Sequence, residues 1–339
     1  MTTSEPLAGT SPRHPPSDGG GDDWRLFRGD GERREKPFPA APPWRRFDRQ
    51  ESPSGAKAPH PRLYLIGPDE ADVVNAALHL RRPLLVTGQP GTGKSSLAHA
   101  VAHELALGRV LQWPVNSRST LQDALYQYDA VGRLREATLR RDADGAGGAE
   151  PDIGQYIRLG PLGTALVPRE RPRVLLIDEL DKGDVDLPND LLTVFEEGEF
   201  AIPELTRLPE GRAAVHVETD DPDDPAPVTR GRVRCREFPV VIITSNGERD
   251  FPPAFLRRCV RLDLPEPNER RLREIVAVHL GSDALDDVDD LLREFLERRA
   301  AGELATDQLL NAVFLRKGGV DLDAPSLLRA VLHQLGGAV

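Results

Sequence analysis

The chain has 339 residues, of which 29% are charged, and a formal net charge of −11. Its length suffices for one large or two moderate domains with a sizeable core. The acidic balance disfavours a general nucleic-acid binder, because such a protein must neutralise phosphates. No apolar run approaches the ~20 residues that a membrane helix needs, and the first residues lack the pattern of a signal peptide. We therefore expect a cytoplasmic protein with no membrane partner.

The first 60 residues are predicted to form a disordered arm. They are dominated by proline, glycine, arginine and acidic residues, a composition that buries too little apolar surface to offset the entropy of ordering. Two stretches of this arm, Asp23–Arg28 and Pro43–Phe47, place aromatic residues beside arginines. Trp and Arg are favoured anchors at interfaces, so these stretches are either docking motifs or occasional aromatics in a loose tail.

A glycine-rich loop after a short apolar strand is the first chemical motif. The strand is predicted at 83–87, and a helix is predicted from Ser95 to Ala106. Glycines in the loop allow backbone N–H groups to surround an anion at the positive end of that helix. In a GxxxxGK[ST] loop, Lys94 would reach the β- and γ-phosphates and Ser95 would bind magnesium. The predicted nucleotide-binding residues are Gly88, Gln89, Pro90, Gly91, Thr92, Gly93, Lys94, Ser95 and Ser96.

Two further apolar strands end in polar residues. The strand at 173–178 ends in Asp178 and Glu179, which are predicted to hold magnesium and to polarise the attacking water. In isolation, such a pair of acids is as often a helix cap or a solvated turn. The strand at 240–244 leads to Asn246, which is predicted to bind the lytic water or the γ-phosphate. The residues after Asn246 are not those of a guanine-binding motif, which favours adenine.

The order of elements predicts an α/β core followed by a helical region. Strands alternating with helices indicate a parallel sheet with helices on both of its faces. Two long polar stretches interrupt this pattern near 130–161 and 203–239, and the second resembles a hairpin with its tip at Asp220–Pro225. After residue 265, apolar residues recur at helical spacing. Strands are expected at 83–87, 110–114, 173–178, 240–244 and 260–264, and late helices at 269–280, 288–299, 305–315 and 326–335.

From about Tyr64 onward, the ordered motifs resemble those of AAA+ ATPases and, within them, the MoxR-like branch. The blocks that carry the resemblance are 88–95, 160–162, 175–182, 189–199, 202–204, 244–246 and 255–259. The resemblance implies a P-loop AAA+ core at 61–265, with inserts near 130–161 and 203–239, and a small helical lid at 266–339. It also implies Walker A roles for Lys94 and Ser95, Walker B roles for Asp178 and Glu179, and a sensor 1 role for Asn246.

Arg257 and Arg258 lie where this family carries the arginine finger, which reaches the nucleotide of a neighbouring subunit. Either one fits, Arg249 is a more distant candidate, and the alternative is a pair of solvated basic residues. The family's sensor 2 arginine is expected near Ser326, which is not an arginine. Arg299 or Arg329 would have to replace it, or the contact is absent.

The resemblance implies a catalytic unit built from several copies of the chain. ATP and Mg²⁺ are the expected cofactors, and the expected assembly is a homo-oligomer, a hexameric ring in this family. Hydrolysis would remodel, load or activate a client protein, and MoxR-like ATPases commonly work with von Willebrand factor A domain proteins. The alternative function is a nucleotide-controlled scaffold for a signalling or defence complex. A DNA-loading motor is disfavoured by the acidic charge.

Overall fold

The computed structural model describes residues 26, 39–45, 64–144, 152–209, 214–286, 288–301, 304–322 and 325–333. Most of the predicted disordered arm, including all of Asp23–Arg28 except Leu26, lies outside the described residues, as does part of the stretch near 130–161. None of the helices in the described ranges has both the length and the apolarity required to span a bilayer.

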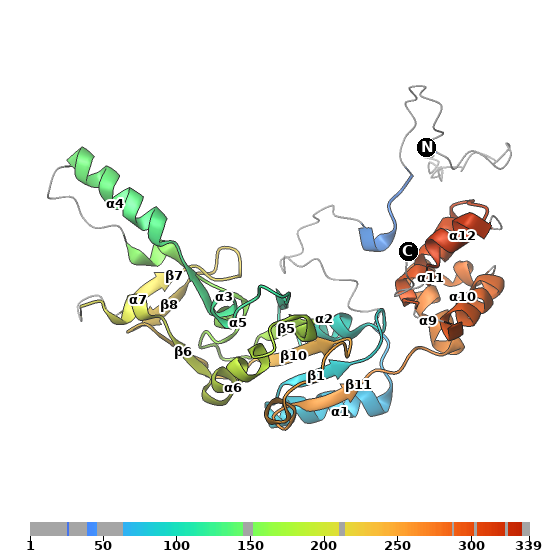
Figure 1. The fold of residues 1–339 in the computed structure, drawn as a ribbon, viewed down its shortest axis with the longest axis horizontal. Coiled ribbons are helices and arrows are strands. Elements are labelled where there is room, and N and C mark those ends of the chain that lie inside the picture. The colour runs from blue at the N-terminus through green and yellow to red at the C-terminus, as the bar shows by residue number, and fades with distance from the viewer. Residues whose placement is uncertain are drawn as a thin grey trace, which may run out of the picture.

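A five-stranded parallel sheet forms the centre of the molecule, in the strand order β11-β1-β10-β5-β2 (Figure 1). All five predicted strands form, and the α/β fold class is confirmed. The three central strands are apolar until their last residues because helices cover both faces of the sheet, whereas the edge strands β2 and β11 alternate buried and exposed residues. The strands are β1 (Leu84–Thr87), β2 (Leu111–Pro114), β5 (Val174–Asp178), β10 (Val240–Ser245) and β11 (Val260–Asp263).

Alternate residues of each strand enter two separate cores. In β1, Leu84 and Val86 pack with α1 (Pro68–Leu80) and α2 (Lys94–Glu104), whereas Leu85 packs on the opposite face. That opposite core also contains side chains of several short helices and Cys259, so this cysteine is a packing residue. The helices on that side are α3 (Leu121–Leu125), α5 (Pro161–Ala165), α6 (Leu187–Glu197) and α8 (Pro253–Leu256).

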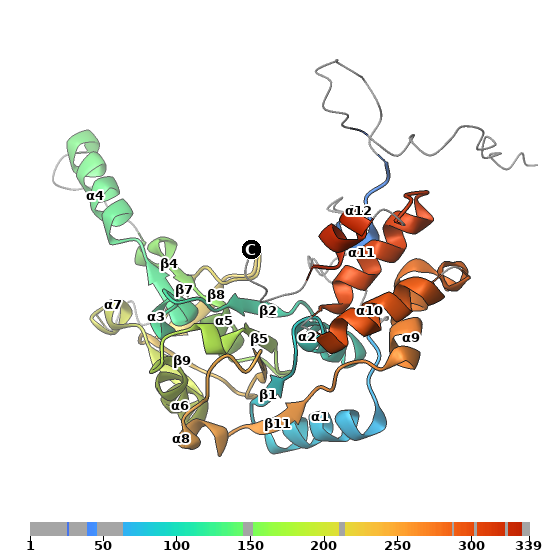
Figure 2. The ribbon, with the colours of Figure 1, turned by 45° about the vertical axis from the view of Figure 1, so that its right-hand side comes forward.

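The two predicted inserts build a second, antiparallel layer beside the core. The hairpin predicted within 203–239 is formed by β7 (Ala214–Val217) and β8 (Ala226–Thr229). The hairpin belongs to a four-stranded sheet that the sequence did not indicate, with the strand order β6-β9-β8-β7. The earlier insert carries α4 (Ala130–Asp144), which projects away from the rest of the molecule (Figures 1 and 2). The remaining elements here are β3 (Tyr126–Tyr128), β4 (Ile157–Leu159), β6 (Glu199–Ala201), β9 (Arg232–Arg234) and α7 (Pro203–Thr206).

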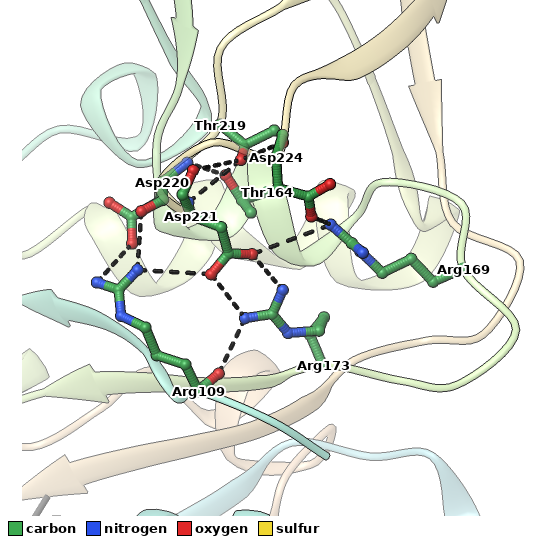
Figure 3. Close-up of polar contacts among 8 residues, drawn as sticks. All are labelled: Arg109, Thr164, Arg169, Arg173, Thr219, Asp220, Asp221 and Asp224. Atoms are coloured by element: carbon green, nitrogen blue, oxygen red, sulfur yellow. Dashed lines mark hydrogen bonds and ion pairs between the residues drawn. The ribbon is translucent and has the colours of Figure 1, made fainter. Parts of the chain in front are cut away.

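A cluster of charged residues fixes the tip of the β7–β8 hairpin to the core (Figure 3). The central carboxylate, Asp221, accepts hydrogen bonds from Arg173, which precedes β5, and from Arg109, which precedes β2. Burial by itself raises the pKa of Asp221, but hydrogen bonding to Arg173 and the charges of the three surrounding arginines outweigh it and hold that pKa below its ordinary value. Arg169 pairs with Asp224 at 2.6 Å. The hairpin is therefore attached to the edge of the sheet opposite the carboxyl ends of its strands.

The C-terminal helices form a small unit with a hydrophobic core of its own, here called the lid (Figure 2). Leu272, Phe295 and Leu309, one from each of three helices, are fully buried in it. A short 3-10 turn, η1 (Pro43–Arg45), also packs against this core. The lid helices are α9 (Glu269–Leu280), α10 (Asp289–Ala301), α11 (Thr306–Lys317) and α12 (Pro325–Val331).

Candidate active site

The glycine-rich loop lies between β1 and α2, at the carboxyl edge of the sheet. Gly91 and Gly93 have φ angles of 77° and 89°, a region that side chains with a Cβ rarely adopt. A Cβ on Gly91 would lie 2.7 Å from the backbone nitrogen of Thr306, at the start of lid helix α11. The loop therefore requires glycine both for its own conformation and for close contact with the lid.

Lys94 opens α2 and is almost fully buried. Its Nζ donates hydrogen bonds to the carbonyl oxygens of Gly88 at 2.7 Å and Gln89 at 2.9 Å. Burial lowers the pKa of Lys94, and the charges of Asp181, Asp178 and Glu179 oppose this shift. An ammonium group removed from water in this way interacts strongly with an anion placed beside it.

The structure brings the two predicted magnesium ligands together. The Ser95 hydroxyl donates to Asp178 Oδ1 at 2.7 Å, although the two residues come from different elements. Thr244 adds a second hydroxyl that donates to the same oxygen at 2.6 Å, and its Oγ1 accepts the backbone N–H of Glu179 at 2.8 Å. The sequence did not assign Thr244 a role; its only signal was a hydroxyl at the end of a buried strand. It joins β10 to the turn that carries the two acids.

This donor set fits magnesium. A hydroxyl and one carboxylate supply hard oxygen ligands, and Mg²⁺ normally completes its coordination with water and substrate phosphates. In the described part of the chain, no cluster of three or more His, Cys, Asp or Glu side chains offers an alternative metal site.

Glu179 follows β5 in a left-handed backbone conformation, with a φ of 59°. For a residue other than glycine this conformation is strained, and such strain is typical of functional sites. Its carboxylate pairs with Lys182 at 2.9 Å and accepts a hydrogen bond from Asn246 Nδ2 at 3.3 Å. The structure thus brings together Glu179 and Asn246, the residues predicted to act on the attacking water.

Asp181 is a buried carboxylate beneath this pair, and the sequence did not identify it as part of the site. Its Oδ2 accepts the backbone N–H groups of Asn246 at 3.0 Å and Glu248 at 3.1 Å. Its Oδ1 has no hydrogen-bond partner among the described residues. Asp181 therefore fixes the backbone that carries Asn246.

A cleft of about 790 Å³ between the core and the lid contains these groups. Residues Pro90 through Ser96 line it, whereas Gly88 and Gln89, also predicted to bind nucleotide, do not. Burial raises the pKa of Tyr64, at the entrance to α1, to about 12, and its ring lies against Gly93. The apolar part of the wall comes from residues to which the sequence assigned no role: Tyr64, Ile66, Leu264, Ile275 and Leu310.

The lid presents different residues to the cleft from those predicted. Helix α12, which contains Ser326, does not line it among the described residues, and neither does Arg299 or Arg329. Arg299 instead donates to the Pro267 carbonyl at 2.9 Å and pairs with Glu266. Helix α11, rather than α12, contacts the glycine-rich loop. The cationic side chains that the lid directs to the cleft come from α9: Arg270 and Arg271.

The arginines proposed as the finger lie after β10, outside the cleft of their own chain. Arg258 pairs with Glu196 and donates to the Ala254 carbonyl at 3.1 Å. Arg249 donates to the Gly183 carbonyl at 2.8 Å. Arg257 is exposed, and its guanidinium has no partner within the described part of the chain. Of the three, Arg257 is the one whose guanidinium makes no hydrogen bond or ion pair with the described residues of its own chain.

Comparison with protein families supports the reading of this site. A family model for the AAA domain of the dynein-related subfamily matches residues 83–259, slightly more than half of the chain. The match runs from just before β1 to just before β11 and so includes the loop, both acids and Asn246. No curated protein matches the chain.

Proposed function

The chain belongs to the AAA domain family, dynein-related subfamily, and is therefore a P-loop ATPase of the AAA+ type; on this premise, we propose that it is a MoxR-like, magnesium-dependent ATPase that acts as a ring subunit and remodels, loads or activates a client protein. One observation supports the catalytic part most directly. Ser95 and Asp178 meet at 2.7 Å, and Glu179 and Asn246 meet at 3.3 Å, within the same cleft.

The cleft offers distinct positions for the parts of ATP. The loop amides and Lys94 would hold the phosphates, and the apolar wall around Tyr64 and Ile275 would receive the base. Ser95 and Asp178 would hold magnesium, which would supply positive charge to neutralise the phosphates. These residues therefore position the γ-phosphate at the carboxyl edge of the sheet.

Glu179 and Asn246 act on the opposite side of the γ-phosphate. Glu179 would orient a water molecule and accept its proton as the water attacks phosphorus and ADP leaves. The Asn246 amide holds the Glu179 carboxylate, and Asp181 holds the backbone of Asn246. Lys182 pairs with the same carboxylate, and the hydrogen bond that Lys182 donates to Glu179 raises the pKa of Lys182.

The ring and the client are proposed from the resemblance to the MoxR-like branch. The exposed Arg257 supports a site shared between subunits, because it lies outside the cleft of its own chain and an arginine finger acts on a neighbour's nucleotide. The projecting helix α4 and the β7–β8 hairpin correspond to the inserts that face the pore or substrate side in that branch. A hexameric assembly with a von Willebrand factor A domain protein as the client follows from the same resemblance.

Two variants of the full chain test the catalytic proposal. Glu179→Gln is expected to bind ATP with wild-type affinity and to hydrolyse it very slowly, whereas Lys94→Ala is expected to bind ATP poorly. Asp190→Asn, an exposed carboxylate on α6, is the matched control and should leave both properties unchanged. Equilibrium binding of a fluorescent ATP analogue and steady-state phosphate release are the measurements. Wild-type turnover in both test variants would contradict the proposal.

The client proposal has a separate test. Glu179→Gln is used as bait in native lysate with ATP, in parallel with the wild-type chain under turnover. A remodelling enzyme should retain its client more strongly in the slowly hydrolysing variant. Equal retention by the two forms with full downstream activity would indicate a nucleotide-controlled scaffold instead.

A further inference from the structure

The proposed catalytic base, Glu179, is followed by a 3-10 turn, η5 (Leu180–Lys182), that brings Lys182 back to it. The backbone N–H of Lys182 donates to the Glu179 carbonyl oxygen at 3.0 Å and closes the turn. In 3-10 geometry, side chains three positions apart lie almost directly above one another. As a result, Lys182 Nζ lies 2.9 Å from Glu179 Oε2.

The Glu179 carboxylate is therefore held at both of its oxygen atoms. Oε1 accepts a hydrogen bond from the Asn246 amide at 3.3 Å, and Oε2 meets the Lys182 ammonium at 2.9 Å. The backbone is fixed as well, because Thr244 Oγ1 accepts the Glu179 N–H at 2.8 Å. Hydrogen bonds between two charged groups are stronger than those with a neutral donor. Of the two contacts at the carboxylate, the one with Lys182 is therefore the stronger restraint.

Lys182 itself does not line the cleft. Glu179 and Asn246 are among the described residues that form its wall, and Lys182 is not. The Lys182 side chain is 40% exposed. The hydrogen bond that it donates to Glu179 and the charges of nearby carboxylates outweigh its partial burial and raise the pKa of Lys182, so the ammonium stays charged. Any effect of Lys182 on the reaction must then pass through the Glu179 carboxylate.

We infer that Lys182 is a positioning residue, which holds the Glu179 carboxylate in the orientation from which it acts on the attacking water. The inference rests on the role of Glu179 as the base, as proposed above. A general base must lie within hydrogen-bond reach of the proton that it accepts, so the fraction of time spent in that orientation limits the rate. The Glu179 side chain is 41% exposed and would otherwise be restrained at its carboxylate only by the long contact with Asn246.

The first test is the steady-state ATPase kinetics of the full chain. Lys182→Met removes the charge and is expected to lower kcat by about fivefold with KM for ATP unchanged, because an ion pair of this exposure shifts the carboxylate between orientations by up to that factor. Lys182→Arg keeps the charge and should recover most of kcat. Lys317→Met is the matched control, because Lys317 forms a similarly exposed ion pair with Asp283 on the lid and does not line the cleft.

The second test separates positioning from a general effect on the turn. In the Glu179→Gln background there is no charge for Lys182 to pair with, so adding Lys182→Met should cause no further loss of kcat. With Glu179 intact, the ratio of wild-type to Lys182→Met kcat should fall toward one as salt is raised from about 0.05 to 1 M, because salt screens exposed ion pairs. A lysine that only stabilised the turn would lower kcat equally in both backgrounds.

The outcomes of the two tests distinguish this inference from the proposed function. A wild-type chain that does not hydrolyse ATP, or Glu179→Gln with wild-type turnover, would contradict both. Slow turnover in Glu179→Gln together with an unchanged or raised kcat in Lys182→Met would overturn the positioning role alone, as would an equal loss of kcat in both backgrounds. A lower kcat at unchanged KM, recovered by Lys182→Arg and absent from the Glu179→Gln background, would establish it.

Discussion

The Asp181 carboxylate accepts the backbone N–H of Asn246 at 3.0 Å, and this contact joins the turn after β5 to the loop after β10. Each of these segments supplies one of the two groups proposed to act on the attacking water. Since Asp181 is buried and does not line the cleft, its effect on the reaction passes through the position of Asn246. Asp181 is a positioning residue in this arrangement.

Replacing Asp181 should therefore change turnover more than ATP binding. A displacement of about 1 Å in a catalytic arrangement costs up to ~100-fold in rate, so we expect Asp181→Ala to lower kcat by about tenfold or more, with KM nearly unchanged. Asp181→Asn keeps an oxygen that can accept both N–H groups and should recover part of kcat. Steady-state ATPase kinetics measure kcat and KM separately for each variant. Equal loss in kcat and in nucleotide affinity would indicate general damage to the site instead.

Arg257 and Arg258 should differ sharply when replaced, although they are adjacent in sequence. Arg257→Ala should lower ring ATPase activity by about 10³-fold, the lower end for loss of an arginine finger, without weakening ATP binding. Arg258→Ala should have a small effect, because its exposed pair with Glu196 contributes at most about 1 kcal/mol.

The measurement for this pair is ATPase activity of mixed assemblies. Arg257→Ala mixed with Lys94→Ala should regain activity, since one interface then combines an intact cleft with an intact arginine. If Arg258→Ala behaves this way and Arg257→Ala does not, the assignment must be reversed.

The Asp221 cluster predicts a specific dependence of stability on pH. The pKa of Asp221 is lowered on folding, so its contribution is fully present above the ordinary aspartate pKa of about 3.9 and is lost as the pH falls through the folded value. Asp221→Asn leaves Arg173 and Arg109 without their shared carboxylate and should cost about 3 kcal/mol near pH 7.

Chemical denaturation at several pH values tests this prediction. The difference between wild type and Asp221→Asn should shrink below pH ~4, because protonation removes the wild-type charge as well. Asp224→Asn is the matched control: Asp224 is half exposed and, among the residues that the structure describes, forms an ion pair only with Arg169, so its loss should cost less than about 1 kcal/mol. A difference that persists unchanged in acid would assign the stability to packing rather than to charge.

The sequence by itself determined the parallel sheet and the main groups of the site. The three central strands, which end in Thr87, Asp178 and Ser245, can be recognised in the sequence as apolar runs, because strands covered on both faces must be apolar. The carboxyl ends of parallel strands meet at one edge, so the loop at 88–95, the two acids and Asn246 were expected to be neighbours. The helices after residue 265 were likewise predicted from the recurrence of apolar residues every three to four positions.

Only the tertiary structure decided which partners complete the site. Asp181 and Thr244 each act through two hydrogen bonds with residues more than sixty positions away, and α11 rather than α12 meets the glycine-rich loop. The same is true of the hydrogen bond from Trp44 to Asn311 of α11, and of the difference between Arg257 and Arg258. Hydrophobic periodicity determines which side of an element is buried, but it does not determine which polar atom faces another. That depends on how the elements pack, which no local pattern records.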